Sequence, residues 1–177
     1  GNSRNGRVAL DSAKVWSTLD PDSVQAQQIL AELYITSGNL SKAKPIVKKL
    51  LEQDAYRGEG FLYLNSILAK VENKKNALRF VLNIAELYPN SKEAHFAVAH
   101  AAYFANNKKL TKSELAKIKK IDPKWQTAVL FEGYIISSES PDQAATFYTS
   151  YLRKYPEAGE VRLEYAKLLT NQKKYSL

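Results

Sequence analysis

The sequence predicts an all-α protein built as an array of stacked antiparallel helix pairs. A mark that ends helical segments recurs at nearly constant intervals, apolar residues between the marks follow helical spacing, and no segment alternates convincingly with a period of two. Proline ends a helix because it lacks an N–H and restricts the residue before it. The marks, at intervals of 34, 34, 34 and 33 residues, are Pro21, Ala55, Pro89, Pro123 and Pro156.

These marks divide the 177 residues into repeated units. We expect a second helix of a partial unit over 7–21 and the first helix of a truncated unit over 157–177. The complete units between them are 22–55, 56–89, 90–123 and 124–156. A small side chain stands twelve residues before four of the marks, where two helices must approach closely, at Ala9, Ala43, Ala77 and Ala144.

Local signals predict where the helices begin and end. Gly38 lies between two helical patterns and suits a helix C-terminus. The segments 111–114 and 140–143 read as capping boxes that open second helices. Thr111 also stands where the second helix of the third unit should have its alanine, so we expect that helix to start late. Pro45 lies near the first turn of a second helix, where it removes a hydrogen bond or bends the axis.

Composition and motifs argue against catalysis. The chain has no cysteine, so it contains no disulfide, thiolate zinc site or cysteine nucleophile, and it has no Gly-rich phosphate loop or HExxH motif. His95 and His100 are five residues apart, about 140° around a helix, and so do not form an i, i+4 metal-binding pair. We therefore expect no enzyme activity, no metal and no cofactor, and we interpret His95 as a core or boundary residue.

The repeats resemble the tetratricopeptide repeat, which has the same period and the pattern shown by Leu30, Ala31, Tyr34, Gly38 and Ala43. The resemblance covers essentially the whole chain. The small-residue position of its first helix holds Ala31, Ala99 and Gly133, but Asn65 in the second unit, where the amide needs a partner. The resemblance implies a right-handed superhelical α-solenoid whose first helices form a concave wall that binds a protein or peptide.

The same resemblance implies which side chains line this groove. They are Gln28, Glu32, Ile35, Leu62, Tyr63, Ser66, Lys70, Phe96, His100, Tyr103, Leu130, Tyr134 and Lys167, with Ala69, Ser137, Leu163 and Thr170 in the same rows. The lysines and asparagines with which some tetratricopeptide domains capture C-terminal carboxylates are absent from these positions. The middle of the groove is aromatic instead, and we expect a partner's apolar side chain to anchor there. For any one ring, packing between first helices is an equal alternative.

The chain is basic, with 26 Lys and Arg against 18 Asp and Glu, a net charge of +8. Its densest basic run, over 108–124, is assigned to a turn and a second helix that face outward. Lysine outnumbers arginine, and the arginine forks that read bases are not evident. We interpret the run as a solvated convex face, with binding of nucleic acid or another anionic partner as the alternative.

Stretches such as 9–21, 58–61 and 160–169 also resemble the repeat region of bacterial cell-envelope proteins, often lipid-anchored, that act as assembly or protease adaptors. This resemblance implies a periplasmic location, with an outer-membrane anchor, and the cytoplasm is the alternative. Because the sequence opens and closes within a unit, we expect the native chain to continue in both directions. Exposed apolar faces on the first and last helices should then permit self-association.

Overall fold

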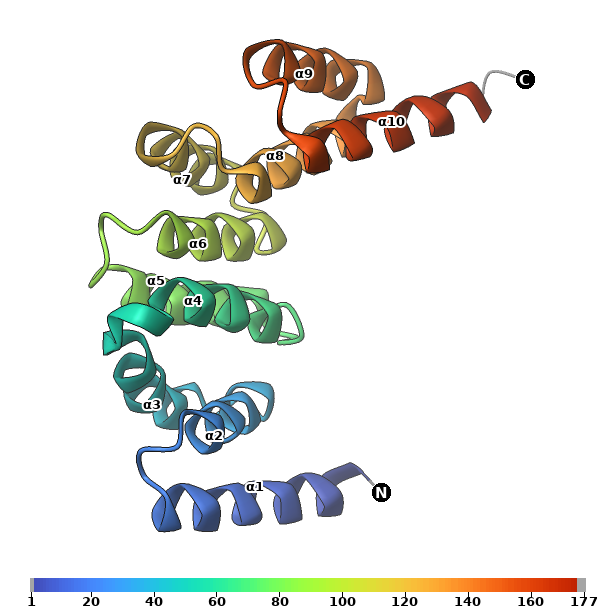
Figure 1. The fold of residues 1–177 in the computed structure, drawn as a ribbon. Coiled ribbons are helices and arrows are strands. Elements are labelled where there is room, and N and C mark those ends of the chain that lie inside the picture. The colour runs from blue at the N-terminus through green and yellow to red at the C-terminus, as the bar shows by residue number, and fades with distance from the viewer. Residues whose placement is uncertain (1, 175–177) are drawn as a thin grey trace. The chain divides into compact units, whose positions relative to one another are not determined.

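The computed structural model describes residues 2–174, apart from the side chains of 2–4, 54–56 and 173–174. This part of the chain contains ten α-helices and no strand (Figure 1). The helices are α1 (Asn2–Leu19), α2 (Val24–Thr36), α3 (Leu40–Glu52), α4 (Asp54–Leu68), α5 (Lys74–Ala85), α6 (Lys92–Phe104), α7 (Lys108–Ile121), α8 (Gln126–Glu139), α9 (Pro141–Lys154) and α10 (Gly159–Lys174). The predicted all-α repeat fold is confirmed.

The proline marks lie where the sequence places them, in the breaks between helices. Pro21, Pro89, Pro123 and Pro156 each fall between the end of one helix and the start of the next. Ala55 does not, because α4 begins at Asp54 and only one residue separates it from the end of α3. Alanine keeps its N–H and favours a helix, so it cannot hold two helices apart as proline does.

Two of the predicted helix ends are confirmed. Gly38 follows α2 with φ of 78°, a left-handed conformation that glycine adopts without steric cost. Ser140 caps α9, since its hydroxyl accepts a hydrogen bond from the Gln143 N–H at 3.3 Å. Pro45 lies inside α3, which continues to Glu52, so this proline does not end the helix.

The predicted late start of the third second helix is wrong. The helix α7 already begins at Lys108, because the Asn107 side chain accepts the Leu110 N–H at 3.1 Å and caps it. Asn106 supplies the preceding turn with φ of 59°. Thr111 is therefore in the helix interior, where it is buried and its hydroxyl donates to the Asn107 carbonyl.

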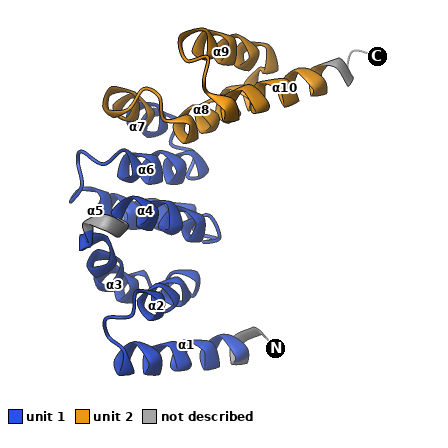
Figure 2. Ribbon diagram, viewed as in Figure 1, with its two compact units in different colours: residues 1–114 blue, residues 115–177 orange. Residues whose placement is uncertain are grey.

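The helices form two compact units, residues 1–114 and 115–177, with the boundary inside α7 (Figure 2). In unit 1, each neighbouring pair from α1 to α4 is packed together, α4 also packs on α2 and α6, and α5 packs on α3 and α6. In unit 2, α8, α9 and α10 all pack on one another. Each unit thus stacks successive antiparallel pairs, and each buries its own apolar cluster.

The two cores differ in composition. The core of unit 1 is mainly aliphatic, and its fully buried side chains include Ile35, Leu51 and Ile84. The core of unit 2 centres on Tyr148 and Val161, with further tyrosines packed around them. In the described residues, no helix is long and apolar enough to cross a bilayer.

Candidate functional site

Most of the residues expected to line a groove are at the surface of first helices. Ile35 is an exception, because none of its side chain is exposed and it belongs to the core of unit 1. It follows Glu32 by three residues, which turns it about 60° around α2 and into the core. Phe96 is also buried, with 6% of its surface exposed. The structure therefore does not support a surface role for these two side chains.

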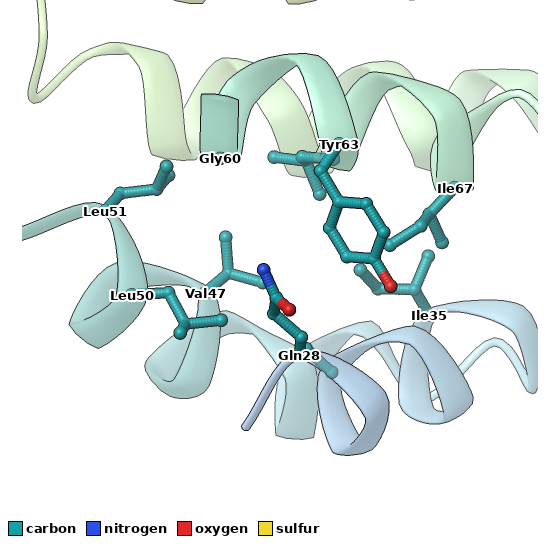
Figure 3. A pocket seen from close by; sticks show the side chains of 10 residues that line it. Gln28, Ile35, Val47, Leu50, Leu51, Gly60, Tyr63 and Ile67 are labelled. Carbon is teal, nitrogen blue, oxygen red and sulfur yellow. The ribbon is translucent and has the colours of Figure 1, made fainter. Parts of the chain in front are cut away.

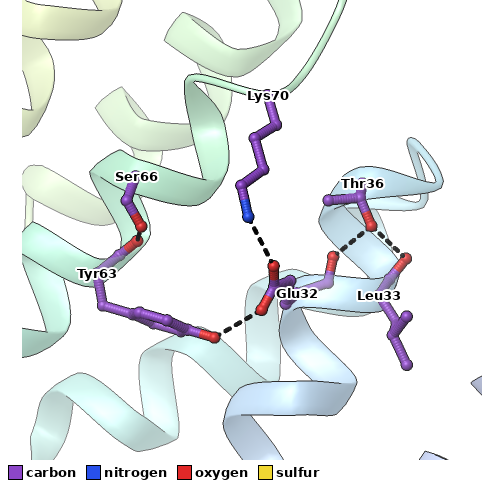
Figure 4. A network of polar contacts seen from close by, with 6 residues as sticks. All are labelled: Glu32, Leu33, Thr36, Tyr63, Ser66 and Lys70. Atoms are coloured by element: carbon purple, nitrogen blue, oxygen red, sulfur yellow. Dashed lines mark hydrogen bonds and ion pairs between the residues drawn. The ribbon is translucent and has the colours of Figure 1, made fainter.

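Glu32 joins two successive first helices of unit 1. Its carboxylate accepts a hydrogen bond from the Tyr63 hydroxyl at 2.7 Å and forms an ion pair with Lys70 at 3.1 Å, as Figure 4 shows. Ser66 lies on the same stretch of α4, and its hydroxyl donates to the Tyr63 carbonyl. Four predicted groove residues are thus brought together, one on α2, two on α4 and Lys70 in the turn that follows α4.

The two partners keep Glu32 ionised. The Tyr63 hydrogen bond lowers the pKa of the Glu32 carboxyl most, burial opposes it, and Lys70 lowers it further. The Glu32 side chain is 31% exposed, whereas that of Lys70 is 62% exposed. The carboxylate is therefore the fixed charge of this pair, and the ammonium is the more solvated one.

A narrow apolar pocket lies beside this network, between α2, α3 and α4 (Figure 3). Its cavity volume is about 20 Å³, which is room for about one water molecule. Gln28 and Tyr63 are among its polar lining groups. The remainder of the lining is apolar or glycine: Ala31, Ile35, Val47, Leu50, Leu51, Gly60, Leu64 and Ile67. A cavity of this size is a small gap in the packing of the three helices and holds no drug-sized molecule.

The rings predicted on α6, those of Phe96, His100 and Tyr103, form a group that also includes Phe104. The His100 ring lies 4.7 Å from the ring of Phe104, which in turn lies 5.3 Å from that of Tyr103 (centroid distances). Phe104 is 44% exposed and was not among the predicted groove residues. Its spacing of four residues after His100 on a helix was the signal that could have identified it.

His100 is neutral at physiological pH. Burial, helped by the positive charge of Lys74, lowers the pKa of its imidazole to about 4. His100 and Lys74 line a small pocket with Leu68, Ala69, Ala77, Ala101 and Phe104. The ring therefore acts as a partly buried aromatic surface and not as a cation.

His95 connects three segments of unit 1. Its Nδ1 lies 2.6 Å from a carboxylate oxygen of Glu114, and its Nε2 lies 2.9 Å from the Pro89 carbonyl oxygen. The His95 side chain is 12% exposed and that of Glu114 only 6%. The interpretation of His95 as a boundary residue is confirmed, and Glu114, predicted as part of a capping box, is instead its buried partner.

The predicted residues of unit 2 are also on its surface. Tyr134 on α8 is 56% exposed, and Leu130 is half-buried one turn before it. Lys167 on α10 is exposed and pairs with Glu164 in the same helix at 3.2 Å. Leu62 on α4, in unit 1, is likewise at the surface and is 38% exposed.

No group of three potential metal ligands occurs among the residues that the structure describes.

The fold is that of solved tetratricopeptide-repeat proteins. It resembles TTC0263, a thermophilic TPR protein from Thermus thermophilus, with 16% identity and a TM-score of 0.57 over 93% of this chain and 91% of that one. A piece of MamA from Desulfovibrio magneticus gives 15% identity and 0.53 over 87% and 88% of the two chains. A tetratricopeptide repeat protein from Parabacteroides merdae gives 14% and 0.55 over 98% and 70%. No protein-family model and no curated protein matches the chain.

Proposed function

We propose that this chain, which has the fold of tetratricopeptide-repeat proteins, is a non-catalytic scaffold that binds a segment of a partner protein along its first helices. The supporting observation is the convergence of Gln28 and Glu32 of α2, Tyr63 of α4 and Lys70 of the turn after α4 beside a small apolar pocket. A mixed surface of this kind, with an apolar recess and fixed polar groups, is typical of peptide recognition.

Site-specific photocrosslinking tests this function. A photoreactive amino acid at Ser66, beside the network on α4, should crosslink the partner polypeptide several-fold more strongly than one at Lys75. Lys75 is a matched control because it is exposed on a second helix of the same unit. Equal crosslinking at both positions would argue against a binding surface on the first helices.

Self-association is the second part of the proposal. Large apolar side chains are exposed on α1, where Val8, Val15 and Leu19 are 58%, 59% and 80% exposed, and on α10, where Leu163 is 59% exposed. Apolar surface of this kind favours association. Light scattering coupled to size-exclusion chromatography should show concentration-dependent oligomers that Val15→Lys removes, and a monomer at every concentration would refute this part.

The resemblance to bacterial envelope proteins supports a further proposal, that the scaffold works on the periplasmic side of the envelope in assembly or proteolysis. Cell fractionation of the native protein tests it, and recovery with cytoplasmic markers would overturn it. The alternative function, binding of an anionic partner by lysines, has exposed lysines on α7 in its favour, including Lys112, Lys117 and Lys120. It predicts salt-dependent retention on heparin at physiological ionic strength.

A further inference from the structure

We propose that the second helices α3 and α5 of unit 1 form a surface that binds the anionic headgroups of a lipid bilayer. This inference goes beyond the scaffold function, because it concerns second helices and not the first helices that would hold a protein segment. It also differs from the binding of an anionic partner by lysines of α7, since it concerns other helices and commits to one class of partner.

Positive charge in unit 1 is concentrated on these two second helices. Four lysines and one glutamate lie on α3, and two lysines, one arginine and no acid lie on α5. The first helices α2, α4 and α6 together carry two basic and four acidic residues. A surface that only has to stay soluble mixes both signs. Segregation of one sign onto one kind of helix therefore favours a binding role for that charge.

Four of these cations form a basic face, with Lys44 and Lys48 on α3 and Lys75 and Arg79 on α5. The two residues of each helix are four apart, so they stand one above the other on the same side of that helix. Lys75 and Arg79 are exposed, and the two lysines of α3 are half-buried. The rows are adjacent, because α3 packs on α5 and the Lys44 ammonium donates to Oδ1 of Asn83 on α5 at 3.3 Å.

Neutral amides, and not carboxylates, position the cations of the basic face. The Arg79 guanidinium donates to the side-chain oxygen of Asn76 at 2.7 Å, as Lys44 does to Asn83. Asn83 is itself fixed, because its amide nitrogen donates to the Arg79 carbonyl at 2.9 Å. Among the residues that the structure describes, no acidic side chain forms an ion pair with any of the four cations. Their charge is therefore available to an anion from outside the chain.

The composition of the basic face favours a lipid surface over nucleic acid. Proteins that hold single strands stack the bases on aromatic side chains, and proteins that read duplex DNA use arginine forks. No aromatic residue occurs in α3, and the one aromatic residue of α5, Phe80, is 6% exposed and in the core. Lysines bind a bilayer as point charges, because anionic headgroups move laterally and gather beneath them. The basic face therefore fits lipid headgroups better than either form of nucleic acid.

Cosedimentation with lipid vesicles tests the inference on the whole chain. One set of vesicles contains phosphatidylcholine alone, and in the other about a third of the lipid is phosphatidylglycerol. We expect binding to the anionic vesicles only, and we expect added salt to weaken it because salt screens exposed charges. Absence of binding, or equal binding to both kinds of vesicle, would overturn the inference.

Two double variants separate the basic face from net charge. Lys75→Gln with Arg79→Gln should weaken vesicle binding by about 25-fold, since each basic residue near an anionic bilayer contributes about fivefold. Arg153→Gln with Lys154→Gln removes the same charge from exposed positions of α9 in unit 2 and should change binding by less than about twofold. Equal losses in both variants would show that net charge alone causes binding. Circular dichroism checks that the helices of each variant are intact.

Competition separates lipid from nucleic acid. Duplex DNA, added at the same phosphate concentration as the anionic lipid, should not release the protein from the vesicles. Release by DNA would assign the basic face to nucleic acid and overturn the lipid assignment.

The photocrosslink at Ser66 distinguishes failure of this inference from failure of the scaffold function. The variant that carries Lys75→Gln and Arg79→Gln should crosslink the partner polypeptide at Ser66 as the natural chain does. A natural chain that crosslinks at Ser66 but binds no anionic vesicle would overturn this inference and leave the scaffold function standing. Vesicle binding without crosslinking would do the reverse.

Discussion

Val47 and Ala31 line an open pocket in unit 1, whereas at the equivalent positions of unit 2 Tyr148 packs against Gly133 with no space between them. A Cβ built on Gly133 would overlap the hydroxyl and ring carbons of Tyr148. The residue on the first helix is thus smaller where its partner on the second helix is larger. The difference teaches that the repeat fixes the helix positions, while the pair of side chains at each position decides whether a core or a recess results.

The largest effect that would break this complementarity is expected from Gly133→Ala. Alanine normally stabilises a helix interior relative to glycine by about 0.5–1 kcal/mol. Here we expect a destabilisation of about 3 kcal/mol, because the buried Tyr148 ring cannot move aside easily. Thermal unfolding followed by circular dichroism measures it.

Two controls make the Gly133 prediction specific. Gly159→Ala should be nearly neutral, because no atom lies within 4 Å of a Cβ placed there. Tyr148→Val, combined with Gly133→Ala, should recover most of the loss by restoring the kind of pair found in unit 1. A Gly133→Ala variant as stable as the natural chain would refute the complementarity.

The second difference lies in the response to acid, because both histidines are in unit 1. The pKa of His100 is about 4 in the folded protein and 6.5 when unperturbed, so the unfolded chain takes up a proton that the folded chain does not. The contribution to stability is complete above pH 6.5 and is lost as the pH falls to 4. It is on the order of 2 kcal/mol after allowance for partial exposure.

Urea unfolding of the natural chain and of His100→Leu, at several values of pH between 7 and 4, tests the histidine prediction. The difference in unfolding free energy between the two proteins should shift in favour of the variant as the pH falls. A difference that does not change with pH would show that His100 takes up its proton equally in both states.

The third difference is a charge in a core position. Glu132 of unit 2 stands at the repeat position that Leu30 and Leu64 occupy in unit 1. One of its carboxylate oxygens pairs with Lys119 at 2.7 Å, and the other has no hydrogen-bond partner. We expect Glu132→Leu to stabilise the protein by about 1–2 kcal/mol, since replacing a partly buried ion pair with apolar packing is often favourable.

A second variant of the same ion pair should change the stability in the opposite direction. Lys119→Gln should destabilise the protein, because it leaves Glu132 charged without its partner. Chemical denaturation compares the two. If both variants destabilise the protein equally, the ion pair itself stabilises unit 2 and the correspondence with Leu30 and Leu64 has no energetic meaning.

The smallest effect concerns how first helices are capped. In unit 1, the side chains of Ser23 and Ser91 cap the N-termini of α2 and α6, the helices that directly follow them. In unit 2, the Gln126 side chain on α8 instead accepts the N–H of Glu160 at the start of α10, a residue 34 positions later in the chain, at 3.1 Å. Gln126→Ala should cost about 1 kcal/mol and increase amide exchange at the start of α10. Gln25→Ala, at an exposed position of α2, serves as the matched control.

The sequence predicted the repeat because periodicity and proline chemistry are local properties. Four of five marks fall in helix breaks, and Gly38 and Ser140 end or begin helices as predicted. Thr111 misled the prediction because its capping pattern competes with that of Asn107, and only the packing of α7 shows which one is used. The side-chain amide of Asn65 was expected to need a partner, and its side-chain oxygen Oδ1 has none.

By itself, the sequence determined the helices and their pairing, because both follow from residues that are close together along the chain. Its composition, which lacks cysteine, excluded disulfides and thiolate chemistry. Only the tertiary structure decided that Ile35 is core, that Tyr63 and Lys70 share Glu32, and that Val47 leaves a pocket which Tyr148 fills in unit 2. Those outcomes depend on the volumes and rotations of side chains from different helices. A pattern along one helix does not contain that information.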